Sequence, residues 1–194
     1  MKLWWNRRRG RRRKLSRSKS GLPAGEERLR RLAHNIDRLA DKDEDLIRRE
    51  RETEALRRTA AARLHAVCAA FVGDLNGLLQ RGEVRLDPET FDVDLFQPDT
   101  PTLIQIQVRG RILQIAFTAT PGLVSTEEFR IPYILEGSVR AFNQRMLDKH
   151  LMEEQLLFFT LEGRSNLWRY FDTRTYRSGL FDREYLTTLM EEVI

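Results

Sequence analysis

The feature that most limits the fold of this chain is a long stretch without proline. From Glu26 to about Arg81 there is no proline, and the only glycines are Gly73 and Gly77. Proline removes a backbone donor and breaks a helix interior, so this stretch can be helical throughout. A single helix of about 55 residues would be some 80 Å long, at 1.5 Å per residue. Gly82 follows as a C-terminal stop.

Two different apolar patterns divide this helical stretch. Steps of 3, 4 and 3 residues, which is heptad spacing, separate Leu29, Leu32, Ile36 and Leu39. Residues 41–54 are almost all charged and offer no packing face. The stripe then returns with a mean step of about 3.67 residues, close to that of a straight helix, at Leu56, Ala60, Leu64, Val67, Phe71, Leu75 and Leu78. We therefore expect a seam-forming helical unit at 26–40 and one docked on a globular body at 55–80, either separate or joined in one helix.

The second half of the chain has the composition of a β-sheet. Fourteen of the 17 aromatic residues lie beyond residue 82, and β-branched residues become frequent. Residues 102–117 alternate in polarity around Arg109-Gly110. With a turn at those two residues, Ile106 pairs with Leu113 and Ile104 with Ile115. A slip by one residue would place isoleucine against glutamine, so the pattern fixes the parity of this hairpin.

Further strands are predicted toward the C-terminus. Phe129, Ile131, Tyr133 and Leu135 alternate with polar positions, and Pro132 within them indicates an edge or a bulge. Residues 138–150 fit either a helix or a strand. Residues 155–161 are apolar on both faces and should be covered twice, by a helix on each face or by a dimer across one face. A hairpin through 162–166 leads into a strand at 167–172.

These elements predict an α+β protein in which amphipathic helices pack on an antiparallel sheet of four or five strands. Asp182 can cap a final helix whose apolar stripe is Leu186, Leu189, Met190 and Val193. The predicted organisation is a disordered basic tail and linker at 1–25, a charged helix or coiled-coil segment at 26–54, and an α+β core domain at 55–194. No stretch reaches the roughly 18 apolar residues of a membrane-spanning helix.

Charge is divided very unevenly between the two ends of the chain. Residues 1–20 contain ten basic residues and no acid, a charge of +10, and the remaining 174 residues carry 24 basic residues against 29 acids, a charge of −5. Such a tail repels itself and has little to bury, so we expect it to be disordered. No apolar run follows the charges, so we expect no secretory signal and a cytoplasmic location.

Three interpretations of the tail remain open. It can be a solvated extension with no specific partner, a nucleic-acid attachment, or an anchor to an anionic membrane surface. Indole rings partition to membrane interfaces and also stack on unpaired bases, so Trp4 and Trp5 fit both partners. The candidate anion-binding residues are Trp4, Trp5, Arg7, Arg8, Arg9, Arg11, Arg12, Arg13 and Lys14.

Motifs of enzyme chemistry are absent from the sequence. It contains no phosphate-binding glycine loop, no H-E-x-x-H and no G-x-S-x-G. His150 and Glu153 can share a helix face, and Cys68 follows His65 by three residues, but both pairs are more typical of structural positions. The single cysteine excludes an intramolecular disulfide. We expect no catalytic residue, metal or cofactor.

A second basic and aromatic patch is possible at Trp168, Arg169, Arg174 and Arg177. Aromatic and basic side chains on a sheet can hold single-stranded nucleic acid or phosphate groups. The alternative is that Trp168, Tyr170 and Phe171 belong to the core, with the arginines at its rim.

The sequence thus favours a non-enzymatic binding or adaptor module, with a helical homodimer and a nucleic-acid-binding tail as the leading hypothesis. A peripheral membrane adaptor that uses the same tail is the second hypothesis. An enzyme of unrecognised class is the third, and a protein partner is also possible.

Overall fold

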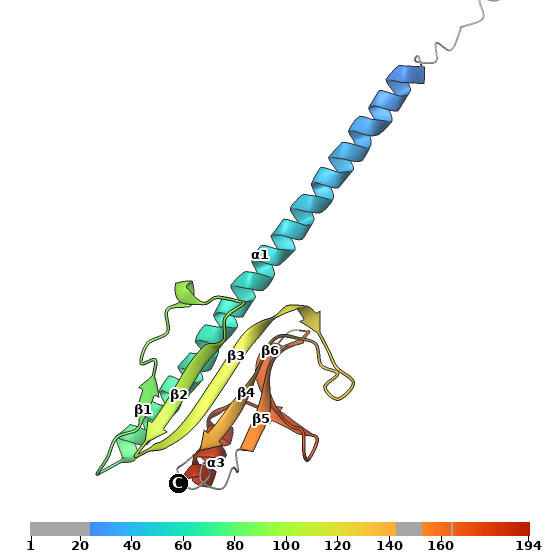
Figure 1. The fold of residues 1–194 in the computed structure, drawn as a ribbon. Helices are drawn as coiled ribbons and strands as arrows, with labels where there is room; N and C mark the ends of the chain where they lie inside the picture. Colours follow the sequence, from blue (N-terminus) through green and yellow to red (C-terminus); the bar gives the residue numbers. More distant parts are fainter. Residues whose placement is uncertain (1–23, 143–152, 164) are drawn as a thin grey trace, which may run out of the picture. The chain divides into compact units, whose positions relative to one another are not determined.

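The computed structural model describes residues 24–142, 153–163 and 165–194. The chain divides into two units, Met1–Ile47 and Arg48–Ile194, which are described separately. The predicted basic tail lies outside the described residues. The predicted helix is confirmed as one element, α1 (Ala24–Leu78), which belongs to both units (Figure 1).

Within the first unit, the described residues form the N-terminal part of α1. Its exposed surface carries ion pairs one turn apart, from Arg30 to Glu26 at 3.3 Å and from Arg31 to Glu27 at 2.6 Å. The seam residues are 55–66% exposed: Leu29, Leu32, Ile36 and Leu39. A coiled coil needs a second chain, so the predicted seam stays a prediction.

The second unit holds the core, and α1 enters it with the predicted stripe. Ala60, Leu64 and Phe71 are buried, and Cys68 lies beside them. The prediction that Leu78 belongs to the packed stripe is wrong, because this residue is 76% exposed. The helix also ends there, before the predicted stop: its last bond runs from Leu79 N–H to the Leu75 carbonyl, and Gly82 has φ of 106° in the loop beyond.

In the described ranges, seven antiparallel strands form one sheet, each paired with the next along the chain. The predicted number of four or five strands is therefore wrong. The strands are β1 (Arg85–Asp87), β2 (Thr102–Val108), β3 (Arg111–Val124), β4 (Tyr133–Phe142), β5 (Glu153–Glu162), β6 (Ser165–Asp172) and β7 (Arg177–Leu180). A short 3-10 helix, Val93–Leu95, lies between β1 and β2.

The hairpin of β2 and β3 has the predicted register. Ile104 pairs with Ile115 and Ile106 with Leu113. Arg109 and Gly110 both have positive φ, of 46° and 77°, as a two-residue turn between twisted strands requires. This hairpin is confirmed, although β3 continues to Val124, beyond the predicted end.

β4 differs from the prediction at both ends. Phe129 and Ile131 lie outside it, because the strand begins at Tyr133, directly after Pro132, which has no N–H to donate to a ladder. The ambiguous segment 138–150 is strand as far as Phe142, so the helical alternative is wrong for 138–142; residues 143–150 lie outside the described part.

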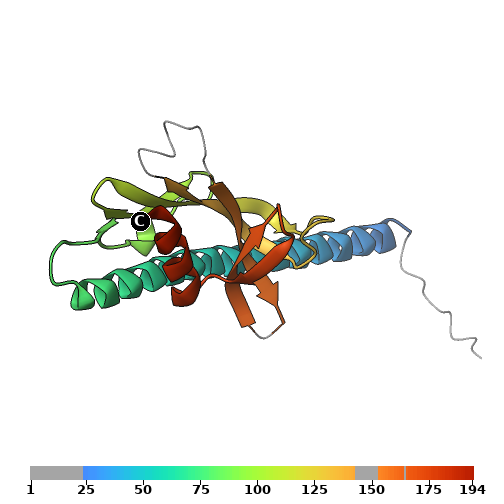
Figure 2. The same ribbon diagram turned by 90° about the horizontal axis from the view of Figure 1, so that it is seen from below.

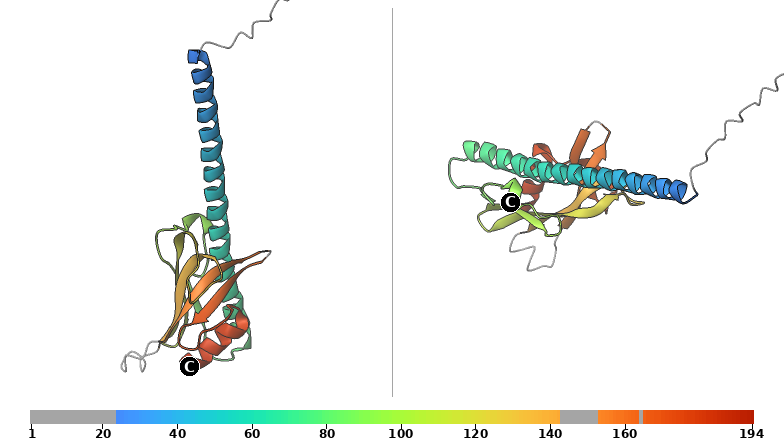
Figure 3. Two further views of the ribbon diagram at one scale, coloured as in Figure 1. Left: turned by 90° about the vertical axis from the view of Figure 1, so that its right-hand side faces the viewer. Right: turned by 90° about the horizontal axis from the view of Figure 1, so that it is seen from above.

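One face of the sheet packs against helices, as Figures 2 and 3 show. Here the core joins residues 48–78 of α1 to α3 (Arg183–Val193). The predicted cap is confirmed, because Asp182 Oδ1 accepts a hydrogen bond of 3.0 Å from Tyr185 N–H. All four predicted apolar residues of α3 are buried.

The prediction that β5 is buried on both faces is confirmed. Leu157 and Phe159 face the helices, whereas Leu156 and Phe158 face the other way. Within the described chain no helix covers the second face; Phe129, from the segment between β3 and β4, packs there, and a dimer across this face stays a prediction. The side of the sheet away from the helices is called the open face below.

Candidate binding pocket on the open face

The open face has a hollow because small side chains lie in the middle of one row across the sheet. Paired positions in successive strands form this row: Leu103, Ala116, Ser138, Leu156 and Phe171. Side chains alternate between faces along a strand, and the buried Ile115 and Phe117 on either side of Ala116 face the helices. The short side chains of Ala116 and Ser138 therefore lie on the open face, between larger neighbours.

A glycine beside this row lets two strands come close together. A Cβ atom on Gly137 would lie 2.1 Å from the Ala116 carbonyl oxygen and 2.7 Å from Phe117 Cα. Both contacts are with backbone or atoms fixed to it. Glycine is therefore required in this arrangement of β3 and β4, which form the floor of the hollow.

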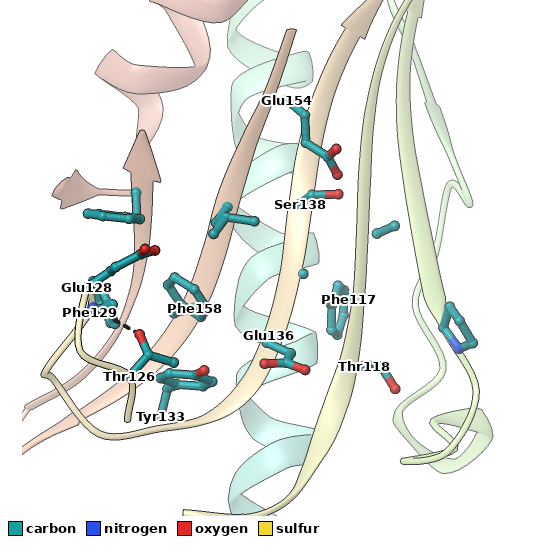
Figure 4. A pocket seen from close by; sticks show the side chains of 15 residues that line it. Phe117, Thr118, Thr126, Glu128, Phe129, Tyr133, Glu136, Ser138, Glu154 and Phe158 are labelled. Carbon is teal, nitrogen blue, oxygen red and sulfur yellow. Dashed lines mark hydrogen bonds between the residues drawn. The ribbon is translucent and has the colours of Figure 1, made fainter. Parts of the chain in front are cut away.

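Aromatic rings form the wall on one side of the hollow. The Phe158 ring centroid is 4.5 Å from that of Phe129 and 4.5 Å from that of Tyr133. Phe129 is held by Thr126, whose Oγ1 accepts from its N–H at 3.0 Å and whose own N–H donates to its carbonyl at 2.9 Å (Figure 4). This reciprocal pair fixes the segment that brings Phe129 over the sheet.

Carboxylates supply the charge around the hollow. Three glutamates line it, Glu128, Glu136 and Glu154, and the described residues of its lining include no lysine, arginine or histidine. In Figure 4, Glu136 lies next to Tyr133, and Ser138 and Glu154 follow further along the strands. The hollow has a volume of about 490 Å³, within the range of sites for small organic ligands. We call it the open-face pocket.

The glutamates of the pocket have different surroundings. Glu154 Oε1 accepts hydrogen bonds from Arg140, at 3.0 Å to Nε and 2.9 Å to Nη2. A hydrogen bond from Ser138 and then this arginine hold the pKa of Glu154 below its usual value. Burial raises the pKa of Tyr133, and so do the charge of Glu136 and a hydrogen bond to it. Within the described residues neither Glu128 nor Glu136 forms an ion pair.

The anion-binding residues predicted in the tail, from Trp4 to Lys14, all lie outside the described residues. The second predicted patch is divided between the two faces of β6. Trp168 faces the helices, where Nε1 donates to the Ala60 carbonyl at 2.8 Å. Arg169 lies on the open face and binds Glu162, at 2.5 Å and 2.9 Å. The two side chains therefore do not form one stacking surface.

The arginines that complete this patch lie where β6 turns into β7. Arg174 Nε is 3.6 Å from Asp172 Oδ1, and Arg177 is paired with the same aspartate across the strands. Trp168 occupies the core position given by the alternative interpretation.

The surroundings of Cys68 and His65, the candidates for nucleophilic chemistry, indicate a structural role. Burial raises the pKa of the Cys68 thiol to about 12, which disfavours the reactive thiolate. His65 Nε2 donates to the Pro88 carbonyl at 2.8 Å. His150 lies outside the described residues, so its proposed pairing with Glu153 does too. In the described part of the chain, no three His, Cys, Asp or Glu residues are grouped to hold a metal ion.

The open-face pocket was missed by sequence reasoning. The apolar residues at 156 and 158 did indicate a second covered face. The hollow itself depends on the pairing of Ala116 with Ser138 across strands, which no single segment reveals.

Comparison of the chain with protein-family models, with curated proteins and with solved structures finds no match. Among the described residues, no helix has the length and apolar character needed to cross a bilayer. The assignment of function therefore depends on the residues themselves.

Proposed function

We propose that the protein is a non-enzymatic binding module that attaches to a polyanion, in the first place nucleic acid, through residues 1–20. The observation that carries the proposal is the division of charge, +10 in residues 1–20 and −5 in the remaining 174. We propose a cytoplasmic location, where the protein would have access to nucleic acid.

Electrostatics makes residues 7–14 the centre of this attachment. They contain seven basic residues in eight positions. Each phosphate that they neutralise releases counterions, and neutralising six to eight phosphates gives a log–log salt slope of roughly −5 to −7 on duplex DNA. Contacts with phosphates carry no base information, so we expect binding without sequence preference.

The surroundings of the candidate nucleophile support a non-enzymatic role. Cys68 is fully buried, and Nε2 of the nearby His65 donates a hydrogen bond to a backbone carbonyl, which gives this histidine a structural role. Nucleophilic catalysis needs an accessible, activated group with a base in reach.

Self-association through the seam of α1 belongs to the same proposal. Four apolar side chains at heptad spacing are more than half exposed in a single chain: Leu29, Leu32, Ile36 and Leu39. Pairing with a second copy would bury them. A dimer would also present two basic segments to one polyanion and so raise the avidity.

An anionic membrane surface is the second candidate partner, and the adjacent Trp4 and Trp5 favour it. Indole rings prefer the interface, and each nearby basic residue adds about 1 kcal/mol of attraction to anionic lipid.

Binding of the full chain to duplex DNA and to vesicles with anionic lipid, at one salt concentration, tests the proposal. We expect DNA binding that weakens by orders of magnitude between about 50 and 200 mM salt. Replacing the seven basic residues of 7–14 by serine should abolish it, and scrambling the DNA sequence should not change it. The matched control is Trp4→Ala with Trp5→Ala, which should weaken only vesicle or single-strand binding.

Two results would overturn the nucleic-acid proposal. Vesicle binding that depends on both tryptophans, with negligible DNA binding near 150 mM salt, would assign the segment to membranes. Binding to neither surface would leave it a solvated extension.

A further inference from the structure

We propose that the open-face pocket is a binding site for an organic cation, a small ligand with an apolar, ring-bearing body and one ammonium-type group. This site belongs to the folded unit Arg48–Ile194 and is independent of the polyanion attachment proposed for residues 1–20.

The walls of the pocket select the apolar body. Phe129, Phe158 and Phe171 line one side, and Ala116 and Leu156 continue the surface along the row. All three phenylalanines are at most 6% exposed, and they pack on each other at centroid distances of 4.5 and 5.6 Å. A rigid apolar wall that is already formed contacts a ring without the entropic cost of ordering side chains.

The charges of the pocket select a cation. Within the described part of the chain, neither Glu128 nor Glu136 of its lining forms an ion pair, and no basic side chain lines the pocket. Arg140 is adjacent but already donates two hydrogen bonds to Glu154. An anionic ligand would meet uncompensated carboxylates, whereas an ammonium group would donate charge-assisted hydrogen bonds to Glu136.

An organic cation fits these carboxylates better than a metal ion. A metal needs several ligands that converge at short distance, and no such group of three exists in the described chain. One carboxylate beside an apolar wall is sufficient for an ammonium group on a hydrophobic body.

Three probes with one indole body and different heads test the proposal: tryptamine, tryptophol and indole-3-acetate, which are cationic, neutral and anionic at neutral pH. Each is titrated into the full-length protein, with the backbone amides followed by NMR. Only shifts around Ser138, Leu156 and Phe158 count as occupation of the pocket, because the arginines of residues 7–14 can attract the anionic probe. We expect tryptamine to bind there about tenfold more tightly than tryptophol, and indole-3-acetate not to bind there.

Two kinds of variant test separately how the charge and the cavity contribute to binding. Glu128→Gln with Glu136→Gln should bring the affinity for tryptamine to within about twofold of the affinity for tryptophol. The matched control is Glu127→Gln, which removes a charge from the same loop outside the pocket lining and should keep the tenfold preference. Ser138→Leu should fill the hollow and abolish binding of both probes. If the Ser138→Leu protein does not fold, Ala116→Leu serves in its place, because it fills the same row from β3.

The proposal is overturned if tryptamine and tryptophol bind the pocket equally, or if their difference survives the double glutamine variant. It is also overturned if a folded variant with a filled hollow binds the probes as the wild type does, or if none of the three probes shifts the amides of the pocket.

Discussion

Gly137→Ala is the sharpest test of the sheet that carries the pocket. The added Cβ would lie 2.1 Å from the Ala116 carbonyl oxygen and 2.7 Å from Cα and Cβ of Phe117. None of these atoms can rotate away, because all belong to the backbone or are bonded to it. β3 and β4 would therefore have to separate by about 1 Å in a close-packed interior.

The size of the effect follows from what this separation would disturb. Phe117 is buried, and its ring lies 5.2 Å from that of Trp168 across the core. Overpacking of a core costs typically 1–3 kcal/mol, and involvement of backbone atoms places this substitution near the upper end, at about 3 kcal/mol. For a protein of this size that lowers the Tm by roughly 6–12 °C. Urea and thermal unfolding followed by circular dichroism measure both quantities.

A second glycine in the same pair of neighbouring strands provides the control. A Cβ on Gly122, in β3, would meet no atom within 4 Å. Gly122→Ala should therefore change the free energy of unfolding by no more than about 0.5 kcal/mol. Equal effects of the two substitutions, or a Gly137→Ala protein as stable as the wild type, would refute the close approach of β3 and β4.

Three other perturbations have clear expected results. Leu32→Asp with Ile36→Asp should shift the protein from dimer toward monomer in sedimentation, and an unchanged distribution would exclude the seam. Gly73→Ala should stabilise α1 by up to about 1 kcal/mol in urea unfolding, because its new Cβ meets nothing within 4 Å; a loss of stability would contradict the helix geometry. Arg169 holds the pKa of Glu162 below its ordinary value of 4.5, so this pair stabilises the fold above that pH and loses its contribution as the pH falls through the lowered pKa. The stability difference between wild type and Glu162→Gln should therefore shrink on acidification, and a difference independent of pH would refute the pairing.

The parts of the fold that local patterns specify could be predicted from the sequence. Alternation of isoleucine and glutamine fixed the parity of the β2–β3 hairpin, because the wrong register exposes every apolar side chain at once. Asp182 could be identified as a cap because its role depends only on the next three residues.

Other elements could not be predicted because they depend on neighbours distant in sequence. β1 and β7 have three and four residues, too few for a periodic pattern, and they are strands because β2 and β6 offer them an edge. Phe129 continues an alternating pattern into Tyr133, but Pro132 interrupts the ladder and Thr126 turns the segment over the open face. Tertiary contacts override the local pattern there.

The same limit applies to the candidate sites. Trp168 and Arg169 are neighbours in sequence and belong to one predicted patch, but they lie on opposite faces of β6, and only the packing of the sheet shows which face lies against the helices. The open-face pocket is still less accessible to sequence reasoning, since Ala116, Ser138 and Leu156 come together only through the register of three strands.

The chemistry of the open face bears on how this chain could hold nucleic acid. A sheet that binds single strands needs exposed aromatic faces with basic residues around them. Among the described residues, glutamates line the open-face pocket and no basic side chain does, so a phosphate backbone would be repelled from it. The open-face pocket is therefore unsuited to nucleic acid, which agrees with the proposal that residues 1–20 bind it without base preference, while the pocket, of opposite charge, takes a ligand of the opposite kind.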